Sequence, residues 1–332
     1  MKPVRYAVIG LGFFGEKHVE VLSDMLGVEL AAVCTRRPDR LKEIAGRFRV
    51  PKTFTNYADL LADPAIDAVS IVTHVNDHRE IAVAALAAGK HVFLEKPMAG
   101  TLADCDWILA AAKSAPCAFM VGHICRFDPR FALAKSAIDE GRIGRIVSMH
   151  ATRNLPAPIG AEVLDKISPL LGDGIHDTDL MLWFTRDSVR TVYAQTVRVR
   201  NFKFPDIAWA VYRFAGGAVG VIETIWALPA TTPYTIDARM EIVGTEGALY
   251  VDCSNPGLTI NDAKGLHKPD TVYWPNLFSH RVGVLRLELS YFVDCLARGK
   301  TPDVITPEES RLAVRTILAA EESAETGKVI SL

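Results

Sequence analysis

The sequence predicts an α/β protein whose amino-terminal half is a doubly wound parallel sheet of the Rossmann type. A short apolar run, residues 4–9, leads directly into three closely spaced glycines and then into a helical pattern. Apolar strands then alternate with helical segments as far as residue 122. Because this alternation produces right-handed crossovers, the strands are expected to lie parallel. Beyond that point, strands such as residues 208–214 and 218–225 follow one another through short turns.

The three glycines form a G-x-G-x-x-G pattern between the first strand and the first helix. They are Gly10, Gly12 and Gly15, with Phe13 and Phe14 between the last two. In this context the glycines permit a tight turn, close approach of a pyrophosphate to backbone N–H groups, and tight packing of helix on strand. We therefore predict a dinucleotide site formed by these five residues. A glycine-rich turn without a ligand is the alternative interpretation.

The end of the second strand, residues 28–34, bears on the choice of dinucleotide. NAD-specific sites usually present an Asp or Glu to the ribose about 20 residues beyond the glycines. This chain has Thr35, Arg36 and Arg37 instead. Guanidinium groups pair with phosphate, so the segment favours NADP over NAD without excluding NAD. Solvated turn residues are the other interpretation of the two arginines.

The carboxyl ends of parallel strands meet at one edge of a sheet, and several polar residues follow such ends here. We expect this edge to line the cofactor crevice with Thr73, His74, His78, Glu95 and Lys96. His74 and His78 are four residues apart, as metal ligands on one helical face often are. No acidic or cysteine third ligand accompanies them, so no metal site is predicted.

Lys96 is the first catalytic candidate. It stands in the segment GKHVFLEKPM, directly after the apolar strand of residues 91–94. A lysine at this position projects from the ligand-binding edge of the sheet. Pro97 restricts the backbone of Lys96 as well as its own, so the ammonium leaves the strand in few directions. The start of a helix with surface charges is the alternative interpretation.

Length and composition restrict the class of protein. With 332 residues, 49% of them hydrophobic, two domains are expected, and we predict a dinucleotide-binding domain over residues 1–122. Residues 123–332 would form a substrate-binding and oligomerisation domain, with the terminal helix packing back on the first. The 37 basic and 39 acidic residues nearly cancel, which argues against nucleic-acid binding and favours a small-molecule substrate. No apolar run is long enough for a membrane span, so a cytoplasmic protein is expected.

The six cysteines are dispersed along the chain and include no CxxC pair. Neither a zinc ribbon nor a disulfide framework is therefore indicated.

Several longer motifs point to one family. With GLGFFGEKH at residues 10–18 and AGKHVFLEKP at residues 88–97, the chain resembles the glucose-fructose oxidoreductase and inositol dehydrogenase family. The blocks GHICRFDP, GRIGRIVS, GIHDTDLMLW, IVGTEGAL and ESAETGKVISL follow in family order. The resemblance implies a Rossmann domain followed by an α/β domain with a large, mostly antiparallel open sheet. It also implies NAD(P)-dependent oxidation or reduction at a carbinol of a sugar, cyclitol or sugar derivative.

The resemblance also implies which residues are catalytic. Lys96 matches the EKP lysine that contacts the reacting hydroxyl, and His176 matches the active-site histidine of the second domain. Taken alone, His176 shares a helical face with Leu180 and would be interpreted as a core residue. The family often has an Asp four residues before this histidine, but Gly172 stands there. Either Asp173 takes that role in a shifted register, or Lys96 and His176 act without it.

Further polar residues are candidate substrate contacts. Arg126, Arg153 and Asn154 flank the start of the second domain, and His280 lies in a segment expected to act as a substrate-facing lid. The predicted substrate-binding set is Lys96, Arg126, Arg153, Asn154, Asp173, His176 and His280. Surface arginines are the alternative for Arg126 and Arg153.

The strand of residues 208–214 carries bulky side chains on both faces. Trp209 and Val211 alternate with Ala210 and Tyr212. A sheet that is apolar on both faces must cover both, and helices can cover one. We predict that a second copy covers the other, giving a homodimer or homotetramer through this sheet.

The leading hypothesis is hydride transfer between a nicotinamide and a substrate carbinol, with His176 as base and Lys96 binding the same oxygen. The two roles could be exchanged, because a lysine in a partly dry crevice has a lowered pKa. The reverse reaction, reduction of a carbonyl compound, uses the same groups. A dinucleotide-binding regulator without turnover is the alternative from another class of protein.

Overall fold

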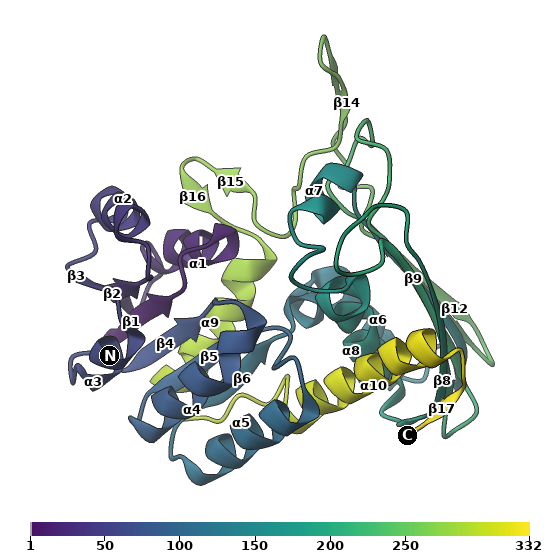
Figure 1. The fold of residues 1–332 in the computed structure, drawn as a ribbon, viewed down its shortest axis with the longest axis horizontal. Helices are drawn as coiled ribbons and strands as arrows, with labels where there is room; N and C mark the ends of the chain where they lie inside the picture. The colour runs from purple at the N-terminus through teal and green to yellow at the C-terminus, as the bar shows by residue number, and fades with distance from the viewer. Residues whose placement is uncertain (1) are drawn as a thin grey trace. The chain divides into compact units, whose positions relative to one another are not determined.

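The computed structural model describes residues 2–332, which form two compact units (Figure 1). The first comprises the chain through Phe127 together with Tyr273–Arg311, and the second comprises Asp128–Val272 with Leu312–Leu332. The division predicted at residue 122 did not anticipate that Tyr273–Arg311 packs with the first unit. No helix within residues 2–332 is long and apolar enough to cross a membrane.

The first unit contains a six-stranded parallel sheet in the order β3-β2-β1-β4-β5-β6, as the fold prediction requires. Its strands are β1 (Val4–Ile9), β2 (Val28–Cys34), β3 (Lys52–Phe54), β4 (Ala68–Ile71), β5 (His91–Glu95) and β6 (Phe119–Gly122). The central strand β4 is buried along its whole length, which explains its continuous apolar run. The edge strand β3 was not predicted, because it is short and has no buried side chain.

Helices cover both faces of this sheet. They are α1 (Phe13–Leu22), α2 (Pro38–Phe48), α3 (Tyr57–Ala62), η1 (Val75–Asp77), α4 (His78–Ala87), α5 (Leu102–Ser114), η2 (Ile124–Phe127) and α9 (Val284–Ala297). Helix α1 contacts α2 and α9 on one face, while α4 contacts α3 and α5 on the other (Figure 1). The unit is thus doubly wound, and the carboxyl ends of its strands share one edge.

The second unit contains a seven-stranded sheet in the order β12-β11-β7-β10-β9-β8-β17. Its strands are β7 (Ile146–Asn154), β8 (Val189–Val197), β9 (Ile207–Phe214), β10 (Val219–Ile225), β11 (Asp237–Gly244), β12 (Ala248–Asp252) and β17 (Ile330–Ser331). Strands β7 and β10 pair in parallel, and every other pair is antiparallel. The large, mostly antiparallel sheet implied by the family resemblance is confirmed.

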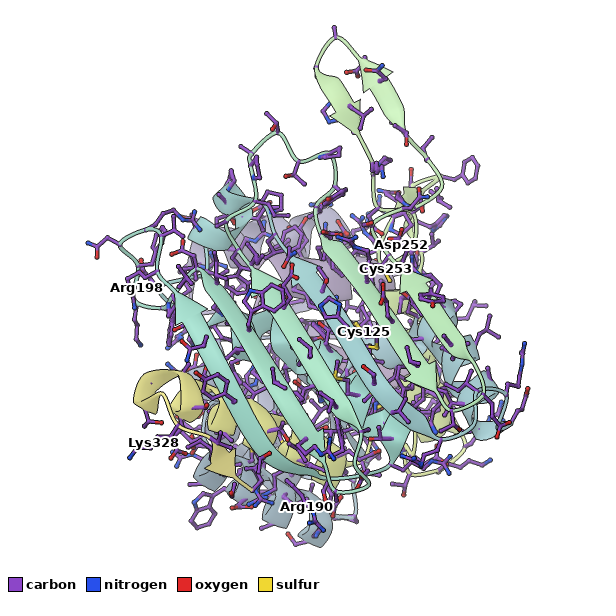
Figure 2. All side chains as sticks on the ribbon, turned by 90° about the vertical axis from the view of Figure 1, so that its right-hand side faces the viewer. Cys125, Arg190, Arg198, Asp252, Cys253 and Lys328 are labelled. Atoms are coloured by element: carbon purple, nitrogen blue, oxygen red, sulfur yellow. The ribbon has the colours of Figure 1, made fainter. Side chains whose placement is uncertain are left out.

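One face of the second sheet is covered and the other is open. The helices of this unit are α6 (Pro129–Asp139), α7 (Ala157–Ala161), η3 (Leu170–Gly174) and α8 (Ile175–Thr185), together with the larger part of α10 (Pro307–Thr326). On β9, Ala210 and Tyr212 are buried, whereas Trp209 and Val211 are 40% and 42% exposed. Figure 2 shows the open face, over which no helix of the described second unit lies. The second copy predicted to cover it stays a prediction.

Two small hairpins form separate two-stranded sheets. They are β13 (Ile260–Asp262) with β14 (Gly265–His267), and β15 (Asn276–Leu277) with β16 (His280–Arg281). The second hairpin is bound to α1, because the Arg281 guanidinium donates to Glu20 at 2.6 Å. His280 and Arg286 both bond to Asp24, just beyond the same helix. These ion pairs, together with the packing of Phe292 of α9 against Tyr6 and Phe93, hold Tyr273–Arg311 in the first unit.

Candidate functional site

The glycine turn after β1 can be formed only with glycine at two positions. Gly10 has φ +97°, and a Cβ there would lie 2.3 Å from the carbonyl oxygen of Val72 at the end of β4. A Cβ at Gly15 would lie 1.9 Å from the carbonyl oxygen of Gly10. The turn is therefore pressed against the end of β4 on one side and against α1 on the other.

Gly12 is different, because the space beside it is open. Apart from Gly12 and its two chain neighbours, no atom of residues 2–332 would lie within 4 Å of a Cβ at Gly12. Helix α1 begins directly after it, and Gly12, as the N-cap residue, supplies no side-chain hydrogen bond to the first N–H groups. An open approach to an uncapped helix start fits a dinucleotide pyrophosphate. Phe13 at this helix start is 70% exposed, whereas the Phe14 ring packs edge-on against His18 and Trp274.

The arginines after β2 have separate contacts. Arg37 donates to the carbonyl oxygen of Leu11 in the glycine turn at 3.0 Å, and Arg40 donates to the same oxygen at 3.1 Å. Arg36 is 84% exposed at its side chain and pairs with Asp77 at 3.1 Å. Thr35 receives only a long contact, 3.5 Å, from the backbone N–H of Arg37. Arg37 thus supports the turn, while Arg36 is held by a single exposed ion pair.

The two histidines after β4 have different environments. His74 is exposed and accepts from the backbone N–H of Asn76 at 3.4 Å. His78 is buried, and its ring nitrogens lie 3.0 Å from the Pro97 carbonyl oxygen and 3.3 Å from that of Thr73. Burial lowers the pKa of His78. His78 therefore joins the ends of β4 and β5 through their backbones.

Glu95 and Lys96 lie at the carboxyl end of β5, as predicted. Glu95 is buried and Lys96 is partly exposed, and the peptide bond between Lys96 and Pro97 is cis. One oxygen of Glu95 lies 3.0 Å from Nε2 of His18. The other accepts from the backbone N–H of Lys96 at 3.2 Å. The structure thus brings the glycine turn, the end of β4 and the Glu95–Lys96 pair together at one edge of the first sheet.

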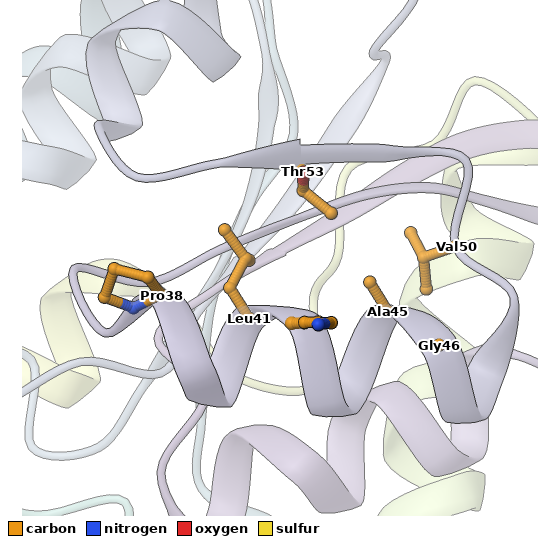
Figure 3. Close-up of a pocket in the computed structure, with 7 residues that line it drawn as sticks. Pro38, Leu41, Ala45, Gly46, Val50 and Thr53 are labelled. Atoms are coloured by element: carbon orange, nitrogen blue, oxygen red, sulfur yellow. The ribbon is translucent and has the colours of Figure 1, made fainter.

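A shallow hollow lies elsewhere on the first unit, between α2 and β3 (Figure 3). Its lining is largely apolar and consists of Pro38, Leu41, Lys42, Ala45, Gly46, Val50 and Thr53. None of the predicted cofactor residues lines this hollow. It therefore adds nothing to the site at the strand ends.

His176 lies near the start of α8 in the second unit. It is buried, and the turn before it, η3, is a π-helix. Such turns add a residue to a helix and recur at functional sites. Within this turn the Asp173 carboxylate accepts from the indole N–H of Trp226 at 2.9 Å.

Gly172, also in this turn, lies against the same indole. A Cβ at Gly172 would lie 2.7 Å from Cη2 of Trp226, which is itself buried. Trp226 therefore occupies the space into which a side chain at position 172 would extend. The carboxylate of Asp173 is bound by this indole.

The other predicted substrate contacts of the second unit are bonded within it. The Arg153 guanidinium forms two hydrogen bonds to Asp177, at 2.8 and 2.9 Å, with both side chains buried. Burial raises the pKa of Asp177, although Arg153 opposes the shift. Asn154 donates to Glu223 at 2.6 Å and accepts from the backbone N–H of Ile225 at 2.8 Å. These contacts link β7 to α8 and β10.

Arg126 and His280 are tied to elements of the first unit. Arg126 is buried in η2 and donates to the Val304 carbonyl oxygen at 2.7 Å and to Glu309 at 3.2 Å. His280 bonds to Asp24 beside α1. The segment containing His280, expected to be a substrate-facing lid, is thus a hairpin held on α1 by ion pairs.

Sequence reasoning missed several polar contacts of the first unit. His18 is the last residue of the motif GLGFFGEKH, but the motif does not predict its contacts. Its Nδ1 lies 3.2 Å from the Ser70 hydroxyl, which donates to the Tyr6 hydroxyl at 3.1 Å. The available signal was a serine and a tyrosine at buried positions of two strands, β4 and β1. Trp226 was also missed, because it has no motif of its own.

A doubly wound sheet, an open glycine turn at an uncapped helix start and a lysine at the same sheet edge define an NAD(P)-dependent oxidoreductase. Residues 4–123 match the oxidoreductase family with an NAD-binding Rossmann fold, and residues 131–250 match the GFO/IDH/MocA C-terminal domain. The chain belongs to this family, which confirms the resemblance described above.

Relatives of known name cover nearly the whole chain. The myo-inositol 2-dehydrogenase of Thermotoga maritima is 30% identical, over 99% of this chain and 98% of that protein. The scyllo-inositol 2-dehydrogenase (NAD(+)) of Bacillus subtilis is also 30% identical, over 99% and 96%. Among solved structures, a probable dehydrogenase from Thermotoga maritima has a TM-score of 0.84 at 29% identity, covering 99% of this chain and 98% of that one.

Proposed function

We propose that this protein transfers a hydride between NAD(P) and a secondary carbinol or carbonyl of a sugar, cyclitol or sugar derivative. The observation that carries the proposal is the position of Lys96 at the sheet edge that also holds the open glycine turn. Relatives named myo-inositol 2-dehydrogenase and scyllo-inositol 2-dehydrogenase support a polyol of the inositol type as substrate. The nicotinamide, when bound, supplies the hydride acceptor or donor.

In this proposal Lys96 binds the reacting oxygen and His176 takes or returns its proton. General acid–base assistance of this kind contributes about 100- to 10,000-fold to a rate. In the alternative arrangement Lys96 exchanges the proton and His176 binds the oxygen. The contact between Asp173 and the Trp226 indole supports action by Lys96 and His176 without a third carboxylate.

A substrate screen tests the proposal. Sugars, inositols and sugar nucleotides would be offered with NAD+ and NADP+, and oxidised forms with the reduced cofactors, while nicotinamide absorbance is recorded. Turnover of a polyol or its keto form is expected. Dinucleotide binding without turnover of any compound would instead support the regulator.

The Lys96→Ala variant tests the residue assignment in the same assay. Its kcat is expected to fall by about 100- to 10,000-fold, because the reacting oxygen loses the amino group that binds it or exchanges its proton. Lys113→Ala is the matched control, since Lys113 is an exposed lysine of α5 paired with Glu308. Full turnover by Lys96→Ala would exclude Lys96 as a catalytic residue.

For the cofactor we propose a modest preference for NADP. Thr35 and Arg36 follow β2 where a carboxylate would favour NAD. The Arg36–Asp77 pair is exposed, and such pairs contribute only about 0–1 kcal/mol, so a phosphate could replace Asp77 at little cost. Arg36→Ala should then raise KM for NADP+ by about 10- to 100-fold, the equivalent of a charged hydrogen bond, and leave KM for NAD+ unchanged. A uniform effect on both cofactors would contradict the preference.

We also propose that the open face of the second sheet joins copies of the chain into a homodimer or homotetramer. Support comes from the exposed Trp209 and Val211 and from Tyr193, 40% exposed, which pairs with Val211 across the sheet. Val211→Lys should dissociate the assembly in light scattering. Leu133→Lys, at a 70% exposed position on α6, should not. A wild-type mass of one chain at micromolar concentration would refute the proposal.

A further inference from the structure

A chain of buried polar groups runs through the core of the first unit, from strand β1 to the end of β5. It comprises Tyr6, Ser70, His18 and Glu95, none of which is more than 6% exposed. Successive members lie 3.1, 3.2 and 3.0 Å apart. Buried polar groups cost free energy unless they are paired, so apolar side chains would have filled the same space more simply. The arrangement therefore calls for a role beyond packing.

This series of buried polar groups ends at the backbone N–H of Lys96. One carboxylate oxygen of Glu95 faces His18, and the other accepts the backbone N–H of Lys96. Gly122 on β6 leaves room for this placement, because a Cβ there would lie 3.0 Å from the Glu95 oxygen that faces His18. Glu95 is thus bound by His18 through one oxygen, and through the other it fixes the backbone of Lys96.

His18, the partner of Glu95 in this contact, belongs to the helix that follows the glycine turn. His18 lies on α1, one turn after Phe14, whose ring packs edge-on against it. Helix α1 begins at the open position beside Gly12. Phe93 of β5 also packs edge-on against the His18 ring. A single side chain therefore connects the helix that receives the dinucleotide with the strand end that carries Lys96.

We infer that His18, acting through Glu95, is a positioning residue that aims Lys96 at the reacting oxygen relative to the bound cofactor. The inference rests on the proposed role of Lys96 in catalysis. When His18 is lost, Glu95 keeps only its contact to the Lys96 backbone and can rotate. A displacement of about 1 Å at a reacting group can lower a rate about 100-fold. Dinucleotide binding is not expected to change, because the glycine turn remains intact.

The experiment compares four variants with myo-inositol and scyllo-inositol as probes. His18→Leu and Glu95→Gln each disturb the pair, and His18→Gln retains an amide donor toward Glu95. Phe292→Leu is the matched control, since Phe292 is buried against Phe93 and Tyr6 in the same core but has no polar contact to Glu95. Glu95→Gln serves if His18→Leu does not fold.

We expect His18→Leu and Glu95→Gln to lower kcat by about 10- to 100-fold and to leave KM for the dinucleotide within about twofold. The deuterium isotope effect on kcat, measured with ring-deuterated inositol, should rise because hydride transfer becomes more rate-limiting. His18→Gln should recover part of the rate. A purely structural role would lower the folded fraction alone, so an unchanged isotope effect in both His18→Leu and Glu95→Gln would overturn the inference.

A second readout does not depend on the substrate. Lysines of each variant would be 13C-dimethylated, and the Lys96 signal, identified with Lys96→Arg, would be recorded by NMR at one pH. The chemical shift of this signal should change in His18→Leu, because the side chain would leave the strand in another direction, and remain in place in Phe292→Leu. If the wild type turns over neither inositol, the proposed substrate fails while this signal still decides the inference. An unmoved Lys96 signal in His18→Leu overturns it.

Discussion

The two units each place a glycine-containing turn before a helix, and the two turns use glycine in opposite ways. At Gly12, before α1, an added Cβ would meet nothing within 4 Å among residues 2–332 other than its chain neighbours. At Gly172, before α8, an added Cβ would lie 2.7 Å from the Trp226 ring. The first glycine leaves space for a ligand, and the second leaves space for another part of the protein. A glycine before a helix therefore indicates a ligand only when the space beside it is open.

Two arginines, Arg36 of the first unit and Arg153 of the second, differ in the same way, because one is open to solvent and the other is bound within the protein. Among residues after β2, Arg36 is exposed and held by one ion pair. In the second unit, Arg153 is buried and satisfied by two hydrogen bonds to Asp177. The first arginine is the one that we propose to bind a phosphate. The second is part of the core, and a substrate could bind it only by competing with Asp177.

The Arg153–Asp177 pair gives the largest expected effect. Arg153→Met would leave Asp177 buried without its counter-charge, which typically costs about 3–5 kcal/mol. The free energy of unfolding, from urea titration, measures the loss. Arg186→Met is the control, because Arg186 is 71% exposed at its side chain and pairs with Asp139; about 0–1 kcal/mol is expected there. If Arg153→Met were as stable as this control, Arg153 would be available to substrate after all.

The next largest effect is expected in the glycine turn, where Gly15 is required for packing and Gly12 leaves space for a ligand. Gly15→Ala places a Cβ 1.9 Å from a backbone carbonyl oxygen, and overpacking of this kind costs about 1–3 kcal/mol or more. Gly12→Ala should keep the stability of the wild type but weaken binding of NAD+ and NADP+. Thermal unfolding and calorimetric titration measure the two quantities. Equal destabilisation by both substitutions would show that the space beside Gly12 is not open in solution.

The turn before α8 should behave as a packed contact. Gly172→Ala forces its Cβ against a buried indole and is expected to cost about 2 kcal/mol, within the range for overpacking. Trp226→Phe removes the ring atoms that clash, so the double variant should be more stable than the sum of the single effects predicts. Urea unfolding of the four proteins gives the coupling energy. Simple additivity would show that Trp226 is not the neighbour that limits position 172.

The sequence predicted the first unit well because its features are local. A glycine pattern, an apolar strand and a lysine after it each depend on residues close together in the chain. Backbone geometry then places the strand ends at one edge without further information. The Lys96 position, the glycine turn and the parallel sheet could all be predicted for this reason.

The second unit was harder because its contacts join distant residues. Asp173 meets Trp226, and Arg153 meets Asp177, only because η3 and α8 pack on the sheet. No local pattern shows which of two neighbouring acidic residues faces an arginine of β7. Likewise, the hairpin containing His280 joins the first unit through ion pairs with residues more than 250 positions earlier. Side-chain partners of this kind require the tertiary fold.

The smallest effect concerns two histidines that the sequence could not tell apart. His78 is buried and has a pKa below the ordinary 6.5, while His74, four residues earlier, is exposed. Below about pH 6.5 this histidine is protonated in the unfolded chain but stays neutral in the folded protein. Protonation of the unfolded chain therefore lowers the free energy of unfolding, by at most about 1.4 kcal/mol at pH 5.5. Above about pH 6.5 this loss is absent.

Variants at the two positions separate this contribution from that of other groups. Between pH 7.5 and 5.5, His78→Gln should lose less unfolding free energy than the wild type, although it starts from a lower value because the bonds to Thr73 and Pro97 are gone. His74→Gln should follow the wild-type curve. Urea titrations at intervals of half a pH unit measure both slopes. If His74→Gln flattened the dependence of the unfolding free energy on pH and His78→Gln did not, His74 and not His78 would cause the loss of stability at low pH.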